Sequence, residues 1–167
     1  MSENDQIDLK IVDLLMEDGR MASAEIARRI GGGISERVVR YRIERMTSDG
    51  VIQIRPIVNA QAFGLTTRAD VVLEVDADAI MDVAHKAMAY ECVSYVACSI
   101  GEMDVSIQVV ARDTAEIYRF VTEVIGKMPG VRKTTTSIVP LVLKDVYQWR
   151  IPRSASLEKS NENSKED

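Results

Sequence analysis

The stretch "ISERVVRYRIERM", residues 34–46, carries four arginines, although the 167-residue chain is acidic, with a formal net charge of −5. Ser35 can cap a helix, because its hydroxyl accepts a hydrogen bond from an N–H group of the first turn. The helix is expected to run to about Ser48 and to end before Gly50. The stretch therefore predicts one short helix with a concentrated positive charge.

At about 100° per residue, this helix has an apolar face and a polar face. The apolar residues on one side are Val39, Ile43 and Met46. The residues that project the other way are Arg37, Arg40, Tyr41 and Glu44. Arg42 lies at the edge of the apolar face, where we expect it to belong to a structural ion pair.

Two further helices are predicted before this one. In residues 5–20, apolar side chains recur at the spacing of one helical face, at Ile7, Ile11, Leu14 and Leu15. Ser23 is a candidate N-cap for "AEIARRI", and the glycine triplet at 31–33 ends that helix in a tight turn that other residues cannot adopt. Two helices joined by a tight turn, the second with an exposed basic face, indicate a helix-turn-helix.

The positive charge is confined to this part of the chain. Residues 20–55 contain eight arginines and four acidic residues, whereas residues 1–19 have a net charge of −5 and residues 56–153 of −2. No apolar run reaches the roughly 18–20 residues that a membrane span needs. The N-terminus also lacks the basic start and apolar stretch of a signal peptide. We therefore expect a cytoplasmic protein without a membrane partner.

The second half of the chain alternates between strand and helix patterns. Strands are predicted at 67–76, 92–101, 104–113 and 131–147, and helices at 78–90 and from Asp113 to about Met128. The order β-α-β-β-α-β is that of the ferredoxin-like split motif, in which two helices cover one face of a four-stranded antiparallel sheet. The chain is therefore expected to be α+β.

The other face of this sheet is predicted to be partly apolar. Its apolar residues are expected to be Val72, Val96, Val110, Ile138 and Val142. An uncovered face of this kind usually needs a partner. We expect it to form the interface of a homodimer.

Double-stranded DNA is the expected partner of the arginine-rich helix, because such a helix fits the major groove and arginine bonds guanine edges bidentately. The expected base contacts are Ser35, Glu36, Arg37, Arg40 and Tyr41. The flanking arginines expected at phosphates are Arg28, Arg29, Arg45 and Arg55. The alternative is a solvated charged face, on which Glu36 and Glu44 neutralise their neighbours.

An ordered set of residues across 5–147 resembles the Lrp/AsnC (feast/famine) transcriptional regulators. The N-terminal set is Asp8, Ile11, Leu15, Asp18, Arg20, Ile26, Ala27, Ser35, Val39, Arg42, Ile43, Gly50, Val51 and Ile52. Later matches are "AFG" at 62–64, a G-x-x-D turn at Gly101 and Asp104, and Val131, Thr134 and Thr136, with Lys133 where arginine is usual. The glycine turn looks one residue longer than is usual for the family.

The resemblance implies an N-terminal winged helix-turn-helix and a C-terminal ferredoxin-like regulatory (RAM-type) domain. It also implies dimers that assemble further, commonly into octamers, and a small effector, usually an amino acid. The candidate effector residues that it implies are Ser99, Gly101, Glu102, Met103, Asp104, Thr134 and Thr136. Alternatively, Gly101 and Asp104 only form a hairpin turn, and the threonines only favour a strand.

The resemblance divides the chain into four parts. The DNA-binding domain is expected at 1–52, a linker at 53–66, and the effector-binding and oligomerisation domain at 67–147. Residues 148–167 are expected to be a polar tail, disordered from Ser154 on.

Two other functions fit the same layout. A siroheme decarboxylase-like enzyme would need histidines and a basic pocket, but the single histidine is His85, and residues 56–153 are net negative. A protein that organises DNA without an effector is the second alternative. Cys92 and Cys98 fit no common metal-binding spacing, so no catalytic, metal or cofactor site is expected.

Overall fold

The computed structural model describes residues 3–152, which belong to two compact units. The helical unit combines the chain up to Ile57 with the chain from Asp145 onward, and the sheet unit is Val58–Lys144. These divisions differ from the boundaries expected at 52/53 and 147/148, because the chain returns to the helical unit after the sheet. Within residues 3–152, no helix has the length and apolar character that crossing a membrane requires.

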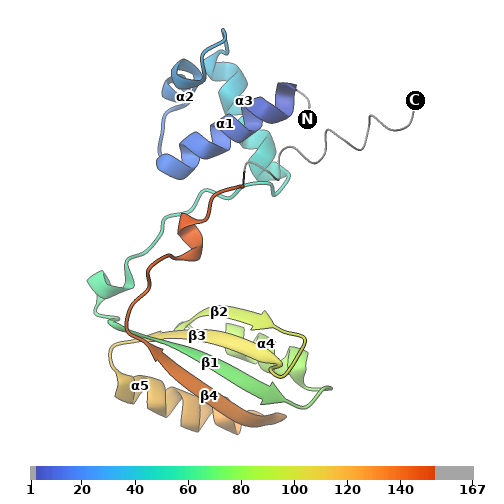
Figure 1. The fold of residues 1–167 in the computed structure, drawn as a ribbon, viewed down its shortest axis with the longest axis vertical. Coiled ribbons are helices and arrows are strands. Elements are labelled where there is room, and N and C mark those ends of the chain that lie inside the picture. Colours follow the sequence, from blue (N-terminus) through green and yellow to red (C-terminus); the bar gives the residue numbers. More distant parts are fainter. Residues whose placement is uncertain (1–2, 153–167) are drawn as a thin grey trace, which may run out of the picture. The chain divides into compact units, whose positions relative to one another are not determined.

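In the described part of the helical unit there are three α-helices, α1 (Glu3–Glu17), α2 (Ser23–Ile30) and α3 (Glu36–Ser48) (Figure 1). Each helix contributes apolar side chains to one core. The buried residues of that core are Ile11, Val12, Leu14, Ile26, Ala27, Val39 and Met46. The predicted apolar faces of α1 and α3 are therefore confirmed, with Val12 as an additional member of the first.

The helix termini show which local signals were informative. The Oγ of Ser35 accepts a hydrogen bond from the backbone N–H of Val38 at 3.3 Å, which confirms the predicted N-cap of α3. Ser23 is the first residue of α2 instead of its cap, and Ala22 precedes the helix without a side-chain bond. Gly31, Gly32 and Gly33 all have φ between 67° and 76°, so the turn before α3 uses a backbone conformation that favours glycine.

The segment after α3, Val51–Ile57, forms no strand within the described chain. Ile52 packs against the helical core, whereas Val51, Ile54 and Ile57 are exposed. Pro56 lacks an N–H donor, and no neighbouring strand of the described chain pairs with this segment.

The chain from Asp145 returns to the helical unit. A short 3-10 helix, Val146–Gln148, is capped by Asp145, and Ile151 then packs against the helical core. The prediction that the polar tail begins at 148 is therefore wrong for residues 148–152, because Ile151 contributes apolar surface to a core. The rest of the predicted tail, from residue 153, lies outside the described residues.

The sheet unit has the predicted β-α-β-β-α-β order. Its elements are β1 (Thr67–Val75), α4 (Ile80–Met88), β2 (Val93–Cys98), β3 (Val105–Ala111), α5 (Thr114–Arg119) and β4 (Val131–Val139). All strand pairs are antiparallel, and the strands lie in the order β2-β3-β1-β4 (Figure 1). The last strand ends at Val139, earlier than expected, because Pro140 follows it.

One face of the sheet packs against the helices. Alternate residues of β1 and β3 are buried there, and so are Val83 and Ala87 of α4 and Ile117 of α5. The helix that begins with α5 continues as a π-helical segment, Phe120–Val124, and a 3-10 turn, Ile125–Lys127. Asp113 caps α5 through its carboxylate, which accepts a hydrogen bond from the backbone N–H of Glu116 at 2.7 Å.

The uncovered face differs from the prediction. Val96 pairs with Ile107, and Ile138 pairs with Ala69, so both lie on the helix-covered side. The strand register shifts at Ser94, between Val93 and Tyr95, which reverses the alternation expected along β2. Val142 follows the last strand, so it belongs to neither face.

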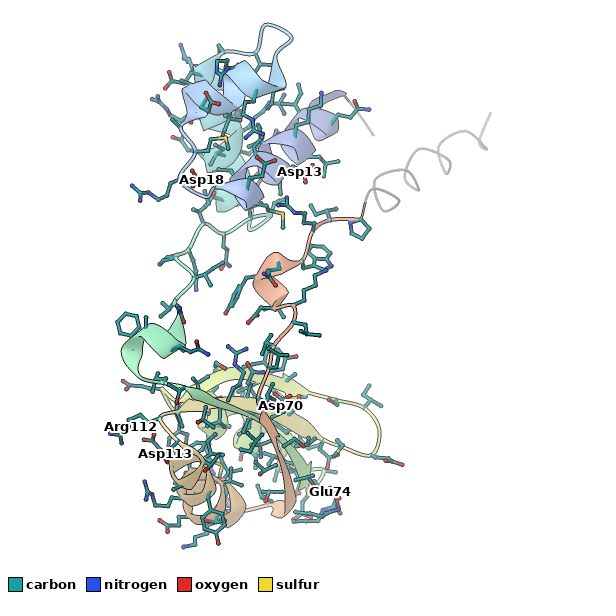
Figure 2. The ribbon with its side chains drawn as sticks, turned by 60° about the vertical axis from the view of Figure 1, so that its left-hand side comes forward. Asp13, Asp18, Asp70, Glu74, Arg112 and Asp113 are labelled. Carbon is teal, nitrogen blue, oxygen red and sulfur yellow. The ribbon has the colours of Figure 1, made fainter. Side chains whose placement is uncertain are left out.

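The uncovered face is consequently mixed in polarity. Val72 and Val110 lie there. So do Asp70 and Glu74 of β1, which are labelled in Figure 2. The amide Nε2 of Gln108 donates to Asp70 at 2.9 Å, and Lys133 pairs with Glu74 at 2.8 Å. The uncovered face therefore carries polar side chains that bond to one another, as well as apolar residues.

Candidate DNA-binding surface and effector site

The outward face of α3 presents the residues that the sequence predicted. Arg37, Arg40 and Tyr41 are exposed, with 63% of the Tyr41 surface accessible, whereas Val39 and Met46 are buried against α1 and α2. Because Ser35 caps the helix, the polar face begins directly at its N-terminus, where the helix dipole favours an anion. The helix can therefore present arginine and tyrosine together to a DNA groove.

The arginines of α3 are held in different ways. Arg42 is mostly buried and pairs with Asp8 of α1 at 2.8 Å, which matches its predicted structural role. Arg45, expected at a phosphate, pairs with the second oxygen of the same carboxylate. Arg40 pairs with Glu36 one turn earlier. Within residues 3–152, Arg37 forms no ion pair, so its guanidinium is directly available to DNA.

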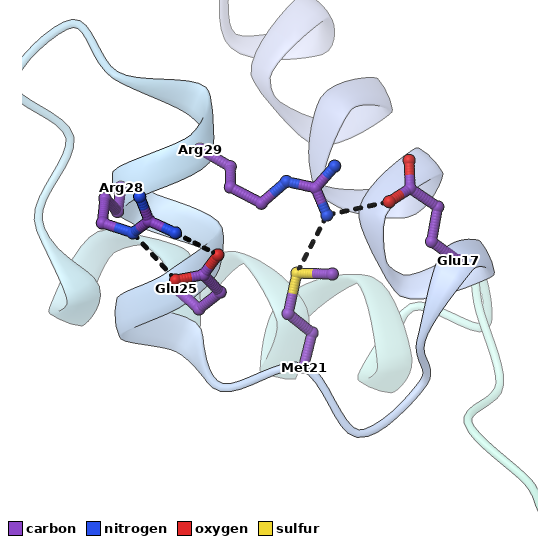
Figure 3. Close-up of polar contacts among 5 residues, drawn as sticks. All are labelled: Glu17, Met21, Glu25, Arg28 and Arg29. Atoms are coloured by element: carbon purple, nitrogen blue, oxygen red, sulfur yellow. Dashed lines mark hydrogen bonds and ion pairs between the residues drawn. The ribbon is translucent and has the colours of Figure 1, made fainter.

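The two arginines of α2 have acidic partners (Figure 3). Arg28 binds Glu25 at 2.6 Å, and Arg29 binds Glu17 of α1 at 2.8 Å. The hydrogen bond from Arg28 lowers the pKa of Glu25 below its ordinary value, and Glu25 in turn raises the pKa of Arg28. Both pairs are solvent-exposed, so an incoming phosphate could replace the carboxylates at little cost. Arg55 lies exposed in the segment after α3.

The candidate effector residues lie in two places in the sheet unit. Ser99, Gly101, Glu102, Met103 and Asp104 form the β2–β3 connection, in which Gly101 has φ +145°. Thr134 pairs with Leu73 and Thr136 with Val71 along β4. The backbone N–H of Asp104 donates to the carbonyl of Leu73 at 3.0 Å. Leu73 is therefore the common neighbour that joins the loop and the Thr134 end of β4.

Asp104 already has a role within the sheet unit. Its Oδ2 accepts a hydrogen bond from the backbone N–H of Val75 at 2.7 Å. Arg132 lies between two acids, 3.7 Å from Asp104 and 3.6 Å from Asp76. The sequence did not identify Arg132, although it directly precedes Lys133 in the segment that the family resemblance singled out.

A groove of about 1420 Å³ lies in the helical unit and not beside the β2–β3 connection. It is lined by α1, by the segment after α3, and by Tyr147, Trp149 and Ile151. Among the predicted site residues, only Arg45 and Arg55 border it. The groove marks where the returning C-terminal segment packs, and sequence periodicity gave no signal for it.

Comparison with known families identifies both halves of the chain. Residues 4–53 match a family described as winged helix-turn-helix DNA-binding, and residues 68–148 match the Lrp/AsnC ligand binding domain. The two matches follow the order of the helical and sheet units.

Curated relatives extend over nearly the whole chain. An HTH-type transcriptional regulator of Pyrococcus horikoshii is 33% identical over 146 residues, which cover 87% of this chain and 91% of that protein. The HTH-type transcriptional regulator FL11 of Pyrococcus abyssi is 32% identical over 148 residues, covering 88% and 96%. These relatives are named as regulators, and the family is one of DNA-binding regulators, not of enzymes.

Solved structures share the fold. AsnC of Escherichia coli superposes with a TM-score of 0.77 at 22% identity, covering 86% of this chain and 97% of AsnC. A Neisseria meningitidis transcriptional regulator, solved as a complex with L-Met, superposes with a TM-score of 0.82 at 22% identity, covering 92% and 99%. With its two domain matches and its full-length relatives, the chain belongs to the Lrp/AsnC family of DNA-binding transcriptional regulators with a ligand-binding domain.

Proposed function

We propose that this regulator binds specific DNA sequences through the outward face of α3 and that a small molecule, an amino acid, modulates its DNA binding or assembly. The observation that supports sequence selectivity is the combination of Arg37, Arg40 and Tyr41 on one exposed face of a helix capped at Ser35. Ser35 and Glu36 stand at the same end of the helix. Arg28, Arg29, Arg45 and Arg55 then contact phosphates and hold the helix in register. Such a protein acts in the cytoplasm, where its DNA lies.

The proposed effector site is the β2–β3 connection together with β4. Gly101 lets the loop turn so that backbone N–H groups can face a carboxylate, while Glu102 carries an exposed negative charge suited to an ammonium group. Thr134 and Thr136 provide hydroxyls on β4, which pairs with the other edge of β1. The Oδ2 of Asp104 is engaged by Val75, so an effector ammonium would reach this residue through its other oxygen. The L-Met complex of the Neisseria meningitidis regulator supports an amino acid as the class of ligand.

We further propose that the uncovered sheet face forms a homodimer and that dimers assemble into larger rings, octamers among them. The half-buried Val72 and Val110 and the exposed Tyr95 provide apolar surface on that face. The hydrogen bond between Gln108 and Asp70 would offset part of the cost of burying these two side chains in that interface.

The direct experiment is a gel-shift titration on the DNA upstream of the protein's own gene, at several salt concentrations, with thermal shifts against the standard amino acids. We expect selective binding that weakens steeply with salt, because phosphate contacts release counterions. We also expect at least one amino acid to raise the melting temperature. Equal affinity for random DNA would contradict selectivity and favour a DNA-organising protein, and no thermal shift with any amino acid would contradict the effector.

A further inference from the structure

The ion pair between Glu36 and Arg40 lies on the surface that the proposed function assigns to DNA. The two residues are one turn apart at the N-terminal end of α3, and about half of each side chain is accessible, 48% for Glu36 and 62% for Arg40. Neither residue helps to hold the helices together, unlike Arg42 and Arg45, which pair with Asp8 of α1. The pair can therefore open without unfolding the helical unit.

A carboxylate on this surface opposes binding to DNA in general. Phosphate oxygens only accept hydrogen bonds, so no phosphate can satisfy Glu36, and the negative backbone repels it. If Arg40 moves to a phosphate, Glu36 loses its partner beside a polyanion. If Arg40 stays on Glu36, it contributes little to binding. In either case the pair lowers affinity for DNA that offers only phosphates.

Base edges in the major groove can replace both partners at once. Guanine presents two acceptors, O6 and N7, which suit the guanidinium of Arg40. Cytosine presents the N4 amino donor, which suits the carboxylate of Glu36. A G·C pair, or two neighbouring pairs that provide both groups, therefore returns to each residue the hydrogen bonds that opening the ion pair removes.

We propose that Glu36 and Arg40 act as one specificity-determining unit that selects a guanine together with a nearby cytosine and disfavours other DNA. This inference rests on the proposed function, because it assumes that α3 enters the major groove. It assigns Glu36 a role in rejecting incorrect sites, and it assigns Arg40 to guanine N7 and O6. Arg37 is then a base contact that needs no such exchange.

The test uses the full-length protein and a duplex that it selects from random DNA, compared with a duplex of the same composition in scrambled order. Replacing guanine by 7-deazaguanine removes N7, whereas inosine keeps both major-groove acceptors and serves as the matched control base. Glu36→Gln removes the charge at residue 36. Glu44→Gln removes the same charge from the same helix at a residue that is not the partner of Arg40.

We expect 7-deazaguanine at one position to weaken wild-type binding about tenfold, with inosine having little effect, and Arg40→Ala to abolish that difference. Glu36→Gln is expected to tighten binding to scrambled DNA, so that the ratio of selected to scrambled affinity falls about tenfold, while Glu44→Gln keeps the ratio near that of the wild type.

Two results would overturn the inference while leaving the proposed function intact. In the first, the wild-type protein selects a DNA site and Arg37→Ala weakens binding to that site, but Glu36→Gln and Glu44→Gln show the same ratio of selected to scrambled affinity. In the second, Arg40→Ala responds to 7-deazaguanine as wild type does. A wild-type protein that selects no sequence would instead contradict the proposed function itself, and the inference with it.

Discussion

Asp8 of α1 holds Arg42 of α3, with its Oδ1 2.8 Å from Nη1 of the guanidinium, and its Oδ2 pairs with Arg45 one turn further along. The carboxylate thus joins the first helix to the arginine-rich helix from a site where only 17% of its side chain is accessible. Its role is to fix the orientation of α3 relative to α1, because two arginines on one side of α3 share a single acid.

Asp8→Asn should destabilise the helical unit by about 2 kcal/mol, because it removes the negative charge that pairs with the mostly buried Arg42. Trp149, the single tryptophan, lines the groove of this unit, so its fluorescence during urea unfolding reports the change. Glu25→Gln removes an acid from an exposed pair and is the control, for which we expect no measurable change. Equal stability of Asp8→Asn and wild type would show that the pair does not hold α3.

Ile151→Asp should loosen the helical unit by about 1–2 kcal/mol, since Ile151 packs against its core. Hydrogen exchange should accelerate at the amides of α1 and remain unchanged in β1. The control is Leu143→Asp, at a residue with 87% of its surface exposed. Unchanged protection of α1 would mean that the returning C-terminal segment adds nothing to the unit.

Gly130→Ala should destabilise the sheet unit by more than about 2 kcal/mol. Gly130 has φ +87°, and an added Cβ would lie 2.3 Å from the Cβ of Ala79. Gly64→Ala provides the comparison, because Gly64 has a similar φ of +78° but open space around it, so only the backbone cost of about 1 kcal/mol remains. Thermal unfolding of both variants checks the difference, and similar losses would contradict the close contact with Ala79.

Acid should weaken the pair between Arg112 and Glu116. Hydrogen bonds from the side chain and backbone of Arg112 lower the pKa of Glu116 below its ordinary value of 4.5. Because the folded-state pKa lies below the unfolded one, the stabilisation is present above pH 4.5 and is lost as the pH falls through the folded value. The melting temperature of Glu116→Gln should therefore approach that of wild type on acidification, and a constant difference between pH 6 and pH 3 would contradict this.

Local patterns were sufficient to predict the order of elements in both units. Helical periodicity, the cap at Ser35 and the glycine turn each depend on neighbouring residues alone, and so does the alternation in β1 and β3. The prediction of which β2 side chains lie on the uncovered face was wrong, because the alternation of residues in the sequence does not reveal the register shift at Ser94. In β4, the run of threonines offers no alternation from which its orientation could be determined.

Contacts between distant residues could not be predicted either. Arg45 was assigned to phosphate because it flanks the expected base contacts, and no local pattern indicates its pair with Asp8, which lies 37 residues away in the sequence. Ile151 lies in the segment that was expected to be a polar tail, and only the return of the chain to the helical unit gives it an apolar environment. The hydrogen bond from Val75 to Asp104 likewise depends on how the β2–β3 connection lies against β1.

The most direct test of the central claim is the ratio of affinities for a selected duplex and a scrambled duplex of equal composition, measured at one salt concentration for wild type and Arg37→Ala. We expect wild type to prefer the selected duplex by at least about 10³-fold. Arg37→Ala should lose about tenfold or more of that preference while its oligomer size stays the same. A wild-type ratio near one, or a preference that Arg37→Ala leaves intact, would contradict the claim that the outward face of α3 selects the DNA sequence.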